Sequence, residues 1–581
     1  HGGTYRGPGD TVPPGAGGAG GGAGPSTPGP AGPGAPGPST PGAPSPAGPS
    51  TGGVPTGAQA GGQLTTEMLQ TGADLTLWTY WWEFNKDPYL QLKAAINKNM
   101  TTGAEDFFNE RGKTKIKETL RPSEELIKQT VVPALLATLQ SEENNDIVTG
   151  CMMALAKIGD TKSETGESEF QKAITPFLRN KVQEISETAA IALGILANDS
   201  TVQTLIDLLE DSPTGRDLVN KKEVDYRTRA YAAYGLALTG KKTPNLEVKQ
   251  KIVDALFRTL DTEKTSSKDL KVSCVIALGL VPIDSATAYE PAEGGKESKD
   301  SKIPRIYRRG QIQALIEYMQ DKKNHEIARA HVPTALARLC EGLEPERFEA
   351  LKREIAPLLL QATTKEAKEK PEVVQSAIYA LGLFGDNDAD KLDKDIRKTL
   401  IDAADSRIDE QAKYFSRVAL AFAGSRVGTG DEPGAGIEDV RKHFLEQIGK
   451  NTKGNIRSWN SVGAGLFGRK LSESGQHLEG IGDALRGVMA DVKDPKEIGS
   501  SAIALGILGE SDSKKALQDK LGTKDEEALG YICVALGMLG ANEAKPQITD
   551  LVEKSKYKPA LLKQTAIALG LLGDKNVVEK L

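Results

Sequence analysis

An Ala-Leu-Gly unit recurs along most of the chain, and this repetition limits the possible folds more than any other feature. Eleven copies can be aligned, each with Ala or Gly at its third position. These third residues are Ala156, Gly194, Gly235, Gly279, Ala337, Gly382, Ala421, Gly465, Gly506, Gly537 and Gly570. Their mean spacing of about 41 residues is typical of repeats built from two helices. The sequence therefore predicts a stack of helical hairpins.

Small residues at the centre of each repeat indicate how the helices pack. A glycine in the middle of a helix costs about 1 kcal/mol relative to alanine. The missing side chain allows two helix backbones to approach closely, so we expect the third positions to lie between successive repeats. Glycines that follow the unit, at Gly159, Gly385 and Gly573, are expected to end their helices in the left-handed conformation. The polar stretch 285–302 lengthens one repeat and is expected to be a surface insertion.

The first 62 residues differ sharply from the repeats. They contain 22 Gly and 14 Pro, and their glycines do not fall at every third position, which excludes collagen. We expect residues 1–62 to form a low-complexity, disordered tether. Because the chain starts at His1, not at Met, we also expect that a signal peptide has been removed and that the protein is exported to the periplasm or the cell surface.

A tryptophan-rich segment at 74–84 lies between this tether and the repeats. It holds three of the four tryptophans, Trp78, Trp81 and Trp82, which are candidate partner-binding residues. On a helix, its apolar side chains would cover roughly two-thirds of the circumference, more than the usual stripe of a surface helix. The helix is therefore either packed on two sides or offered to a partner or a membrane surface. We expect it to seal the first repeat, so that residues 63–122 form a tryptophan-rich cap and connector.

These patterns resemble a known class of repeat protein. The units at about 123–581 resemble HEAT repeats, especially the short Ala-Leu-Gly-rich variety grouped with phycobilisome-lyase-type repeats. The start at 2–14, the Gly/Pro tract and the segment 81–90 resemble exported HEAT-repeat domain proteins of planctomycete bacteria. The resemblance implies an all-α fold, an α-solenoid with a HEAT-like superhelix of about eleven hairpins, the last one open. It transfers no active site.

No motif in the chain predicts catalysis or cofactor binding. Gly463–Gly468 matches the dinucleotide fingerprint, but it lies in a repeat helix and no strand precedes it. His325 and His331 are six residues apart, which places them about 240° apart around a helix and prevents them from sharing a metal ion. No nucleophile–base arrangement is recognisable. We therefore predict no catalytic residue, no cofactor site and no metal site.

The charges argue against nucleic-acid binding. The net charge is −6, whereas a nucleic-acid binder needs clustered lysine and arginine residues. The densest basic spot holds Arg305, Arg308 and Arg309. It is interpreted as a solvated helix face or an intramolecular partner of acidic residues, with a binding patch for an acidic protein or a polyanion as the alternative.

The expected function follows from shape. A HEAT-like solenoid presents a long concave surface, so we expect a non-enzymatic protein–protein interaction scaffold, exported or associated with the cell envelope. One alternative is a self-assembling structural protein of an envelope filament or array, which would make the chain a homo-oligomer. Another is an accessory to a lyase-type HEAT enzyme. Membrane contact is expected only through the tryptophan-rich helix.

Overall fold

The computed structural model describes residues 76–92, 95, 123–159, 168–263, 268–283, 303–405, 409–449, 452, 454–476 and 479–574. Within these ranges the regular structure is helical, and no strand occurs. The predicted all-α solenoid is confirmed. The predicted tether at 1–62 and the insertion at 285–302 lie outside the described residues, as does the end of the chain at 575–581.

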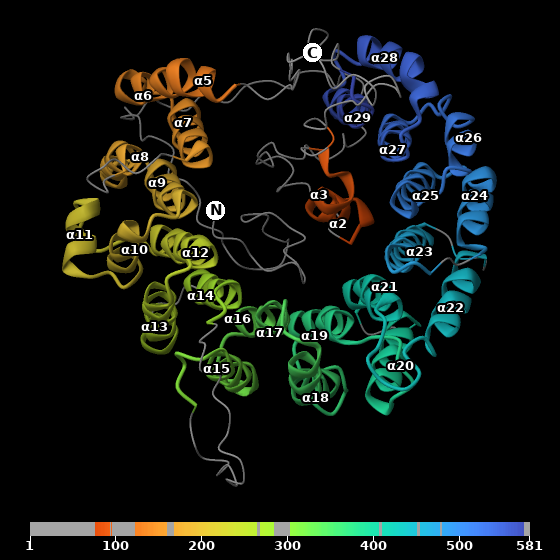
Figure 1. Ribbon diagram of the computed structural model, residues 1–581, viewed down its shortest axis with the longest axis horizontal. Helices are drawn as coiled ribbons and strands as arrows, with labels where there is room; N and C mark the ends of the chain where they lie inside the picture. The colour runs from red at the N-terminus through yellow and green to blue at the C-terminus, as the bar shows by residue number, and fades with distance from the viewer. Residues whose placement is uncertain are drawn as a thin grey trace, which may run out of the picture.

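The helices form an arc with two layers, which Figure 1 shows from above. The inner layer consists of α7 Asn145–Ile158, α9 Gln183–Leu196, α12 Tyr226–Lys242, α14 Lys268–Leu280, α16 Glu326–Ala330, α17 Val332–Cys340, α19 Pro371–Phe384, α21 Glu410–Ser425, α23 Asn455–Glu473, α25 Pro495–Leu508, α27 Glu526–Met538 and α29 Pro559–Leu571. The outer layer consists of α5 Glu124–Leu126, α6 Val132–Ser141, α8 Glu169–Ile174, α10 Val202–Leu209, α11 Pro213–Val219, α13 Leu246–Thr262, α15 Arg308–Gln320, α18 Pro345–Ala362, α20 Lys391–Asp405, α22 Ile437–Gly449, α24 Ile481–Asp491, α26 Ser513–Gln518 and α28 Lys545–Lys554. Two short helices, α2 Trp78–Asn85 and α3 Asp87–Leu90, lie inside the arc.

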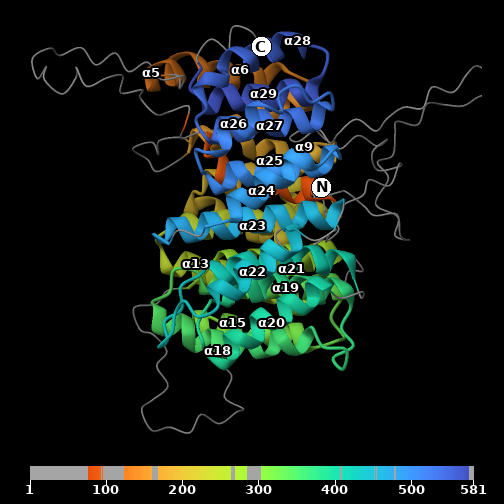
Figure 2. The same cartoon turned by 90° about the vertical axis from the view of Figure 1, so that its right-hand side faces the viewer.

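The inner layer carries the repeat pattern. Each of the eleven third-position residues falls on an inner helix, and α16 and α17 together count as one helix that is broken at His331. Pro333 explains this break, because it lacks an amide hydrogen and stands in the first turn of α17. In the side view, the helices from α28 down to α18 are stacked one above another (Figure 2).

The predicted close approach of the inner helices is confirmed. A Cβ atom added to Gly194 would lie 2.1 Å from the Cα atom of Gly235 on the next inner helix. One added to Gly382 would lie 2.4 Å from the Cα atom of Ala419. Real Cβ atoms do not approach other atoms so closely. The third position of one repeat is therefore small because it touches the backbone of the next repeat.

The ends of the inner helices agree with the prediction at two of three positions. Gly159 and Gly573 have φ angles of 73° and 68°, in the region that favours glycine. The prediction for Gly385 is wrong, since its φ angle is −69°. Close packing requires a glycine at this position instead, because a Cβ atom there would lie 2.7 Å from the Cγ2 atom of Ile396.

The four cysteines are core residues. Cys151, Cys274, Cys340 and Cys533 are all buried and form no disulfide. Burial raises the pKa of Cys274, Cys340 and Cys533 to about 12. These three thiols therefore stay protonated at neutral pH and are poor nucleophiles.

Candidate helix-docking site on the inner face

Helix α2 packs against the C-terminal repeats, far along the sequence from its own position. Figure 1 places α2 and α3 inside the arc, beside α23 and α25. The expectation that this helix seals the first repeat is wrong. The tryptophans of α2 contact the aromatic rings of Trp459 on α23 and Tyr531 on α27, both in the second half of the arc.

Hydrogen bonds fix the start of α2. The indole Nε1 atom of Trp459 donates to the carbonyl oxygen of Thr76 at 2.8 Å. The side-chain amide of Asn455 donates to the same oxygen at 3.1 Å. Both donors come from α23, so this inner helix holds the residue that precedes the first turn of α2.

Aromatic contacts fix the body of α2. The ring centroids of Trp78 and Tyr531 are 4.9 Å apart, and those of Trp81 and Trp459 are 6.4 Å apart. Gly499 on α25 provides room, since a Cβ atom there would lie only 3.4 Å from Cζ2 of Trp78 and 2.9 Å from Cδ2 of Tyr531. The contacts therefore span three successive inner helices.

An ionic contact fixes the end of α2. Lys563 on α29 lies 3.2 Å from the Glu83 carboxylate, and Gln564 donates to the other carboxylate oxygen at 3.4 Å. Lys86, on the same segment, lies 2.7 Å from Glu83. Burial lowers the pKa of Lys563, and the attraction of Glu83 opposes this effect. We define the α2 docking site by Asn455, Trp459, Gly499, Tyr531, Lys563 and Gln564.

The three tryptophans of α2 are almost fully buried. Their exposed fractions are 1% for Trp78, 2% for Trp81 and 0% for Trp82. Burying one such side chain contributes roughly 4–6 kcal/mol by area. The wide apolar face that the sequence shows is therefore covered on two sides, which is one of the two arrangements expected for it.

Three polar atoms of α2 have no hydrogen-bond partner in the described part of the chain. The indole Nε1 atoms of Trp78, Trp81 and Trp82 are buried, and none of them has a hydrogen-bond acceptor among the described residues. Each unpaired donor costs about 1–3 kcal/mol. This cost offsets a large part of what burial of the rings contributes, so α2 is held less tightly than its area suggests.

Helix α3 extends the contact. Tyr89 stacks on Trp82 with ring centroids 6.2 Å apart, and Leu90 is buried. Burial raises the pKa of Tyr89, with Tyr379 and Glu473 adding to the effect. The segment 76–92 therefore packs both of its short helices against the inner layer.

The basic residues singled out in the sequence are engaged within the chain. Arg305 pairs with Asp261 and lies 4.4 Å from the ring centroid of Phe257. Arg309 pairs with Glu354, and Arg308 donates to the carbonyl oxygen of Leu339 at 3.1 Å. The structure does not bring these arginines together with the tryptophans of α2, so the six candidate residues form no single site.

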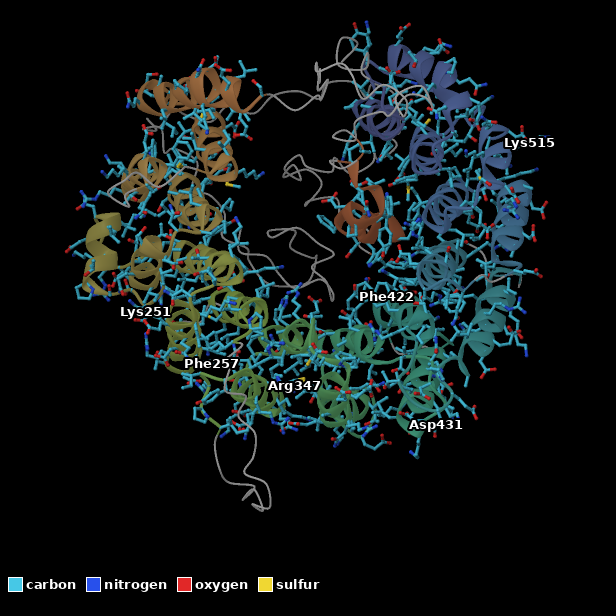
Figure 3. All side chains as sticks on the ribbon, viewed as in Figure 1. Lys251, Phe257, Arg347, Phe422, Asp431 and Lys515 are labelled. Carbon is cyan, nitrogen blue, oxygen red and sulfur yellow. The ribbon has the colours of Figure 1, made fainter. Side chains whose placement is uncertain are left out.

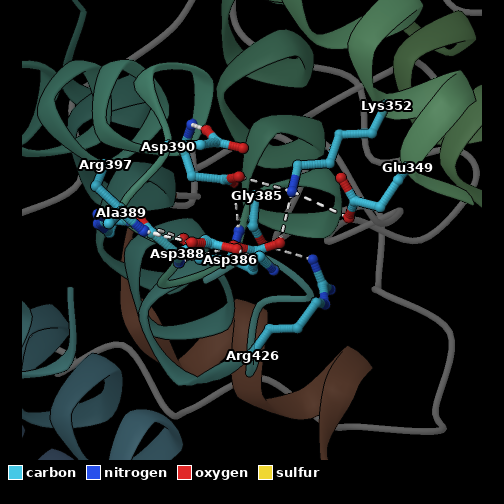
Figure 4. Close-up of polar contacts among 11 residues, drawn as sticks. Glu349, Lys352, Gly385, Asp386, Asp388, Ala389, Asp390, Arg397 and Arg426 are labelled. Carbon is cyan, nitrogen blue, oxygen red and sulfur yellow. Dashed lines mark hydrogen bonds and ion pairs between the residues drawn. The ribbon is translucent and has the colours of Figure 1, made fainter. Parts of the chain in front are cut away.

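A buried ionic cluster joins α18, α19 and α20 (Figure 4). The Lys352 ammonium lies 2.5 Å from Asp386 and 2.7 Å from Asp393, and the three side chains are at most 3% exposed. Arg397 donates to the carbonyl oxygen of Asp386 at 2.6 Å. Burial raises the pKa of Asp393 to about 7, and the nearby Lys352 opposes this shift. The groups satisfy one another, which points to a structural role.

Further ion pairs link successive repeats. Arg329 on α16 donates to both oxygens of Glu369 at 2.9 Å, and Arg457 on α23 lies 2.8 Å from Glu497 on α25. Arg229 on α12 pairs with Glu263, the residue that follows α13. These pairs hold one hairpin to the next.

Motifs that could have indicated other chemistry belong to the helices. Gly463 and Gly465 lie inside α23, and Gly465 faces the backbone of Ala504 on α25. The match to a dinucleotide fingerprint is therefore part of helix packing. In the described part of the chain, no group of three or more His, Cys, Asp or Glu side chains is arranged to hold a metal ion. None of the described helices is long and apolar enough to cross a membrane.

Comparison with known proteins gives similar solved structures but no family. No family model matches the chain, and no curated protein matches it. Kap121p bound to Nup53p is 14% identical with a TM-score of 0.36, covering 79% of this chain and 47% of that one. Kap95p in a structure with RanGDP is 13% identical with a TM-score of 0.39, covering 88% of this chain and 65% of that one. This chain thus spans less than two-thirds of either karyopherin.

Proposed function

We propose that this protein is a non-enzymatic scaffold that binds other proteins through the inner face of its arc. The observation that supports this function is the docking of α2, because a helix far away in the sequence is held there by aromatic and ionic contacts. Recognition of a helix by an apolar surface is a common mode of protein–protein binding. The proposal includes the exported or envelope-associated setting expected from the sequence.

The inner face suits this role in its chemistry. Phe422 lies at the inner edge of α21 (Figure 3), is half-buried and packs edge-on against Tyr379 at 6.2 Å. Aromatic side chains are enriched at protein interfaces, since they contribute large contact areas with few rotatable bonds. In the later repeats the inner helices carry Trp459 and Tyr531, which α2 covers.

Site-specific crosslinking tests the proposal. A photoreactive phenylalanine analogue replaces Phe422 on the inner face, and matched variants carry it at Lys251 or Lys515, which are exposed on the outer layer (Figure 3). We expect a saturable protein adduct in native extract from the Phe422 variant and much less from the two outer variants. Mass spectrometry identifies the attached peptide. Adducts that form equally at all three positions would contradict a role for the inner face.

A further inference from the structure

We propose that the α2 docking site binds an aromatic helix of a partner protein, and that α2 is an internal occupant which this partner replaces. The inference rests on the proposed function, and it specifies the site and the chemistry of the partner. The partner helix carries large aromatic residues at positions i, i+3 and i+4 and a carboxylate at i+5, the spacing of Trp78, Trp81, Trp82 and Glu83.

Helix α2 behaves as a tethered ligand. Its hydrogen bonds to α23 join residues 379 and 383 positions apart, and its bond to Gln564 joins residues 481 apart. A helix of eight residues is too short to be stable alone in water. Its structure therefore depends on the docking site, and 30 residues at 93–122 separate it from the first hairpin.

The docking site recognises features that another helix can supply. Tyr531 and Trp459 accept aromatic rings from the first two turns, and Gly499 leaves space for one of them. Lys563 and Gln564 select a carboxylate that follows the third aromatic residue directly. These five residues give the site a preference for the sequence of its ligand as well as for its helical shape.

The imperfect fit makes α2 replaceable. The three indole Nε1 atoms that find no acceptor among the described residues weaken its hold, although its covalent attachment to the same chain raises its effective concentration at the site. A partner helix with Phe at one of these positions buries a similar aromatic ring without an unpaired donor. Such a helix can therefore compete with α2, although α2 belongs to the same chain as the docking site.

Peptide binding to the full-length protein tests the inference. A labelled peptide with the sequence of residues 74–92 is titrated against the wild type and against the double variant Trp81→Ala, Trp82→Ala, and anisotropy is recorded. The double variant loosens α2 and leaves the docking site itself unchanged. We expect saturable binding to this variant, and at least tenfold weaker binding to the wild type, where α2 competes.

A charge exchange provides the control and a second test. In the Lys563→Glu variant the unaltered peptide and α2 both lose the pairing with Lys563, so its binding should change little. A peptide with Glu83→Lys gains a pairing that α2 lacks, and it should bind this variant at least tenfold better than the unaltered peptide does. This test does not use the double variant, so it remains informative if that variant folds poorly. Circular dichroism establishes that each variant keeps its helix content.

Several results would overturn the inference. One is a folded double variant that binds the peptide no better than the wild type; another is a Glu83→Lys peptide that shows no preference for the Lys563→Glu variant. A dimer of the wild type at micromolar concentration, abolished by Tyr531→Ala, would show that a second copy of this chain is the occupant. If these tests fail while the Phe422 crosslink forms, the scaffold proposal survives without this site.

Discussion

At the scale of single residues, the Lys352 cluster shows how burial and pairing act against each other. Lys352 lies between Asp386 and Asp393, and all three side chains are shielded from water. Burial raises the pKa of Asp393, whereas the two carboxylates raise the pKa of Lys352 against its own burial. Lys352 therefore stays charged at neutral pH, and Asp393 is the group whose protonation changes near pH 7.

Asp393 should make stability depend on pH in a defined direction. Its pKa is about 7 in the folded chain and about 4 in an unfolded one. Between these values the folded state binds more protons, so the contribution of Asp393 to the free energy of unfolding falls as the pH rises from about 4 to 7. Denaturant unfolding of Asp393→Asn should lack this part of the decline. The exposed Asp395→Asn on the same helix is the control and should keep the wild-type profile; equal profiles for all three proteins would contradict the assignment.

At the scale of secondary-structure elements, the contacts between inner helices depend on missing side chains. Gly382 on α19 faces the backbone of Ala419 on α21, and Gly506 faces Ala535 in the same way three repeats later. Gly487 on the outer helix α24 has no atom within 4 Å of its missing Cβ. Gly382 is thus required for close helix packing, whereas Gly487 is not. Only Gly382 stands at the third position of a repeat, so the repeat pattern distinguishes the two.

The variants Gly382→Ala and Gly487→Ala should change stability in opposite directions. In Gly382→Ala the new methyl group forces α19 and α21 apart, and we expect a loss of about 1–3 kcal/mol in the free energy of unfolding. In Gly487→Ala nothing obstructs the methyl group, and the better helix propensity should contribute about 0.5–1 kcal/mol. Thermal and urea unfolding measure both effects. A neutral Gly382→Ala variant would show that the inner helices can separate without cost.

The elements themselves could be predicted well from sequence, for a physical reason. Each repeat buries its small residues against the next one, so the Ala-Leu-Gly pattern is local and recurs at nearly regular spacing. Gly385 was misjudged because its glycine is required by the nearby side chain of Ile396, which sequence does not place. The docking of α2 could not be predicted, since its partners Trp459 and Tyr531 lie hundreds of residues away and match no local pattern.

At the scale of the whole molecule, α2 connects the two ends of the sequence. In a solenoid each hairpin contacts mainly its neighbours, so stability is close to a sum of local terms. The contact of α2 with α23, α25, α27 and α29 is an exception to this rule. It should stabilise the second half of the arc without affecting hairpins at the other end.

Hydrogen exchange can measure this unequal coupling. In the double variant Trp81→Ala, Trp82→Ala, amides of α23, α25, α27 and α29 should exchange faster than in the wild type. Those of α7, α9 and α12 should not change, because nearest-neighbour coupling does not reach them. Exchange that accelerates equally along the whole chain would instead indicate that the arc unfolds as one cooperative unit.

The long sequence separation between α2 and its docking site has a consequence for biosynthesis. Trp459 lies 383 residues after Thr76, the residue it holds. At about 5–20 residues per second, a ribosome needs roughly 20–80 s to complete this stretch. During that time the nascent chain carries three tryptophans with no surface to cover them. A chaperone that shields this short segment until the last repeats emerge would therefore raise the yield of folded protein.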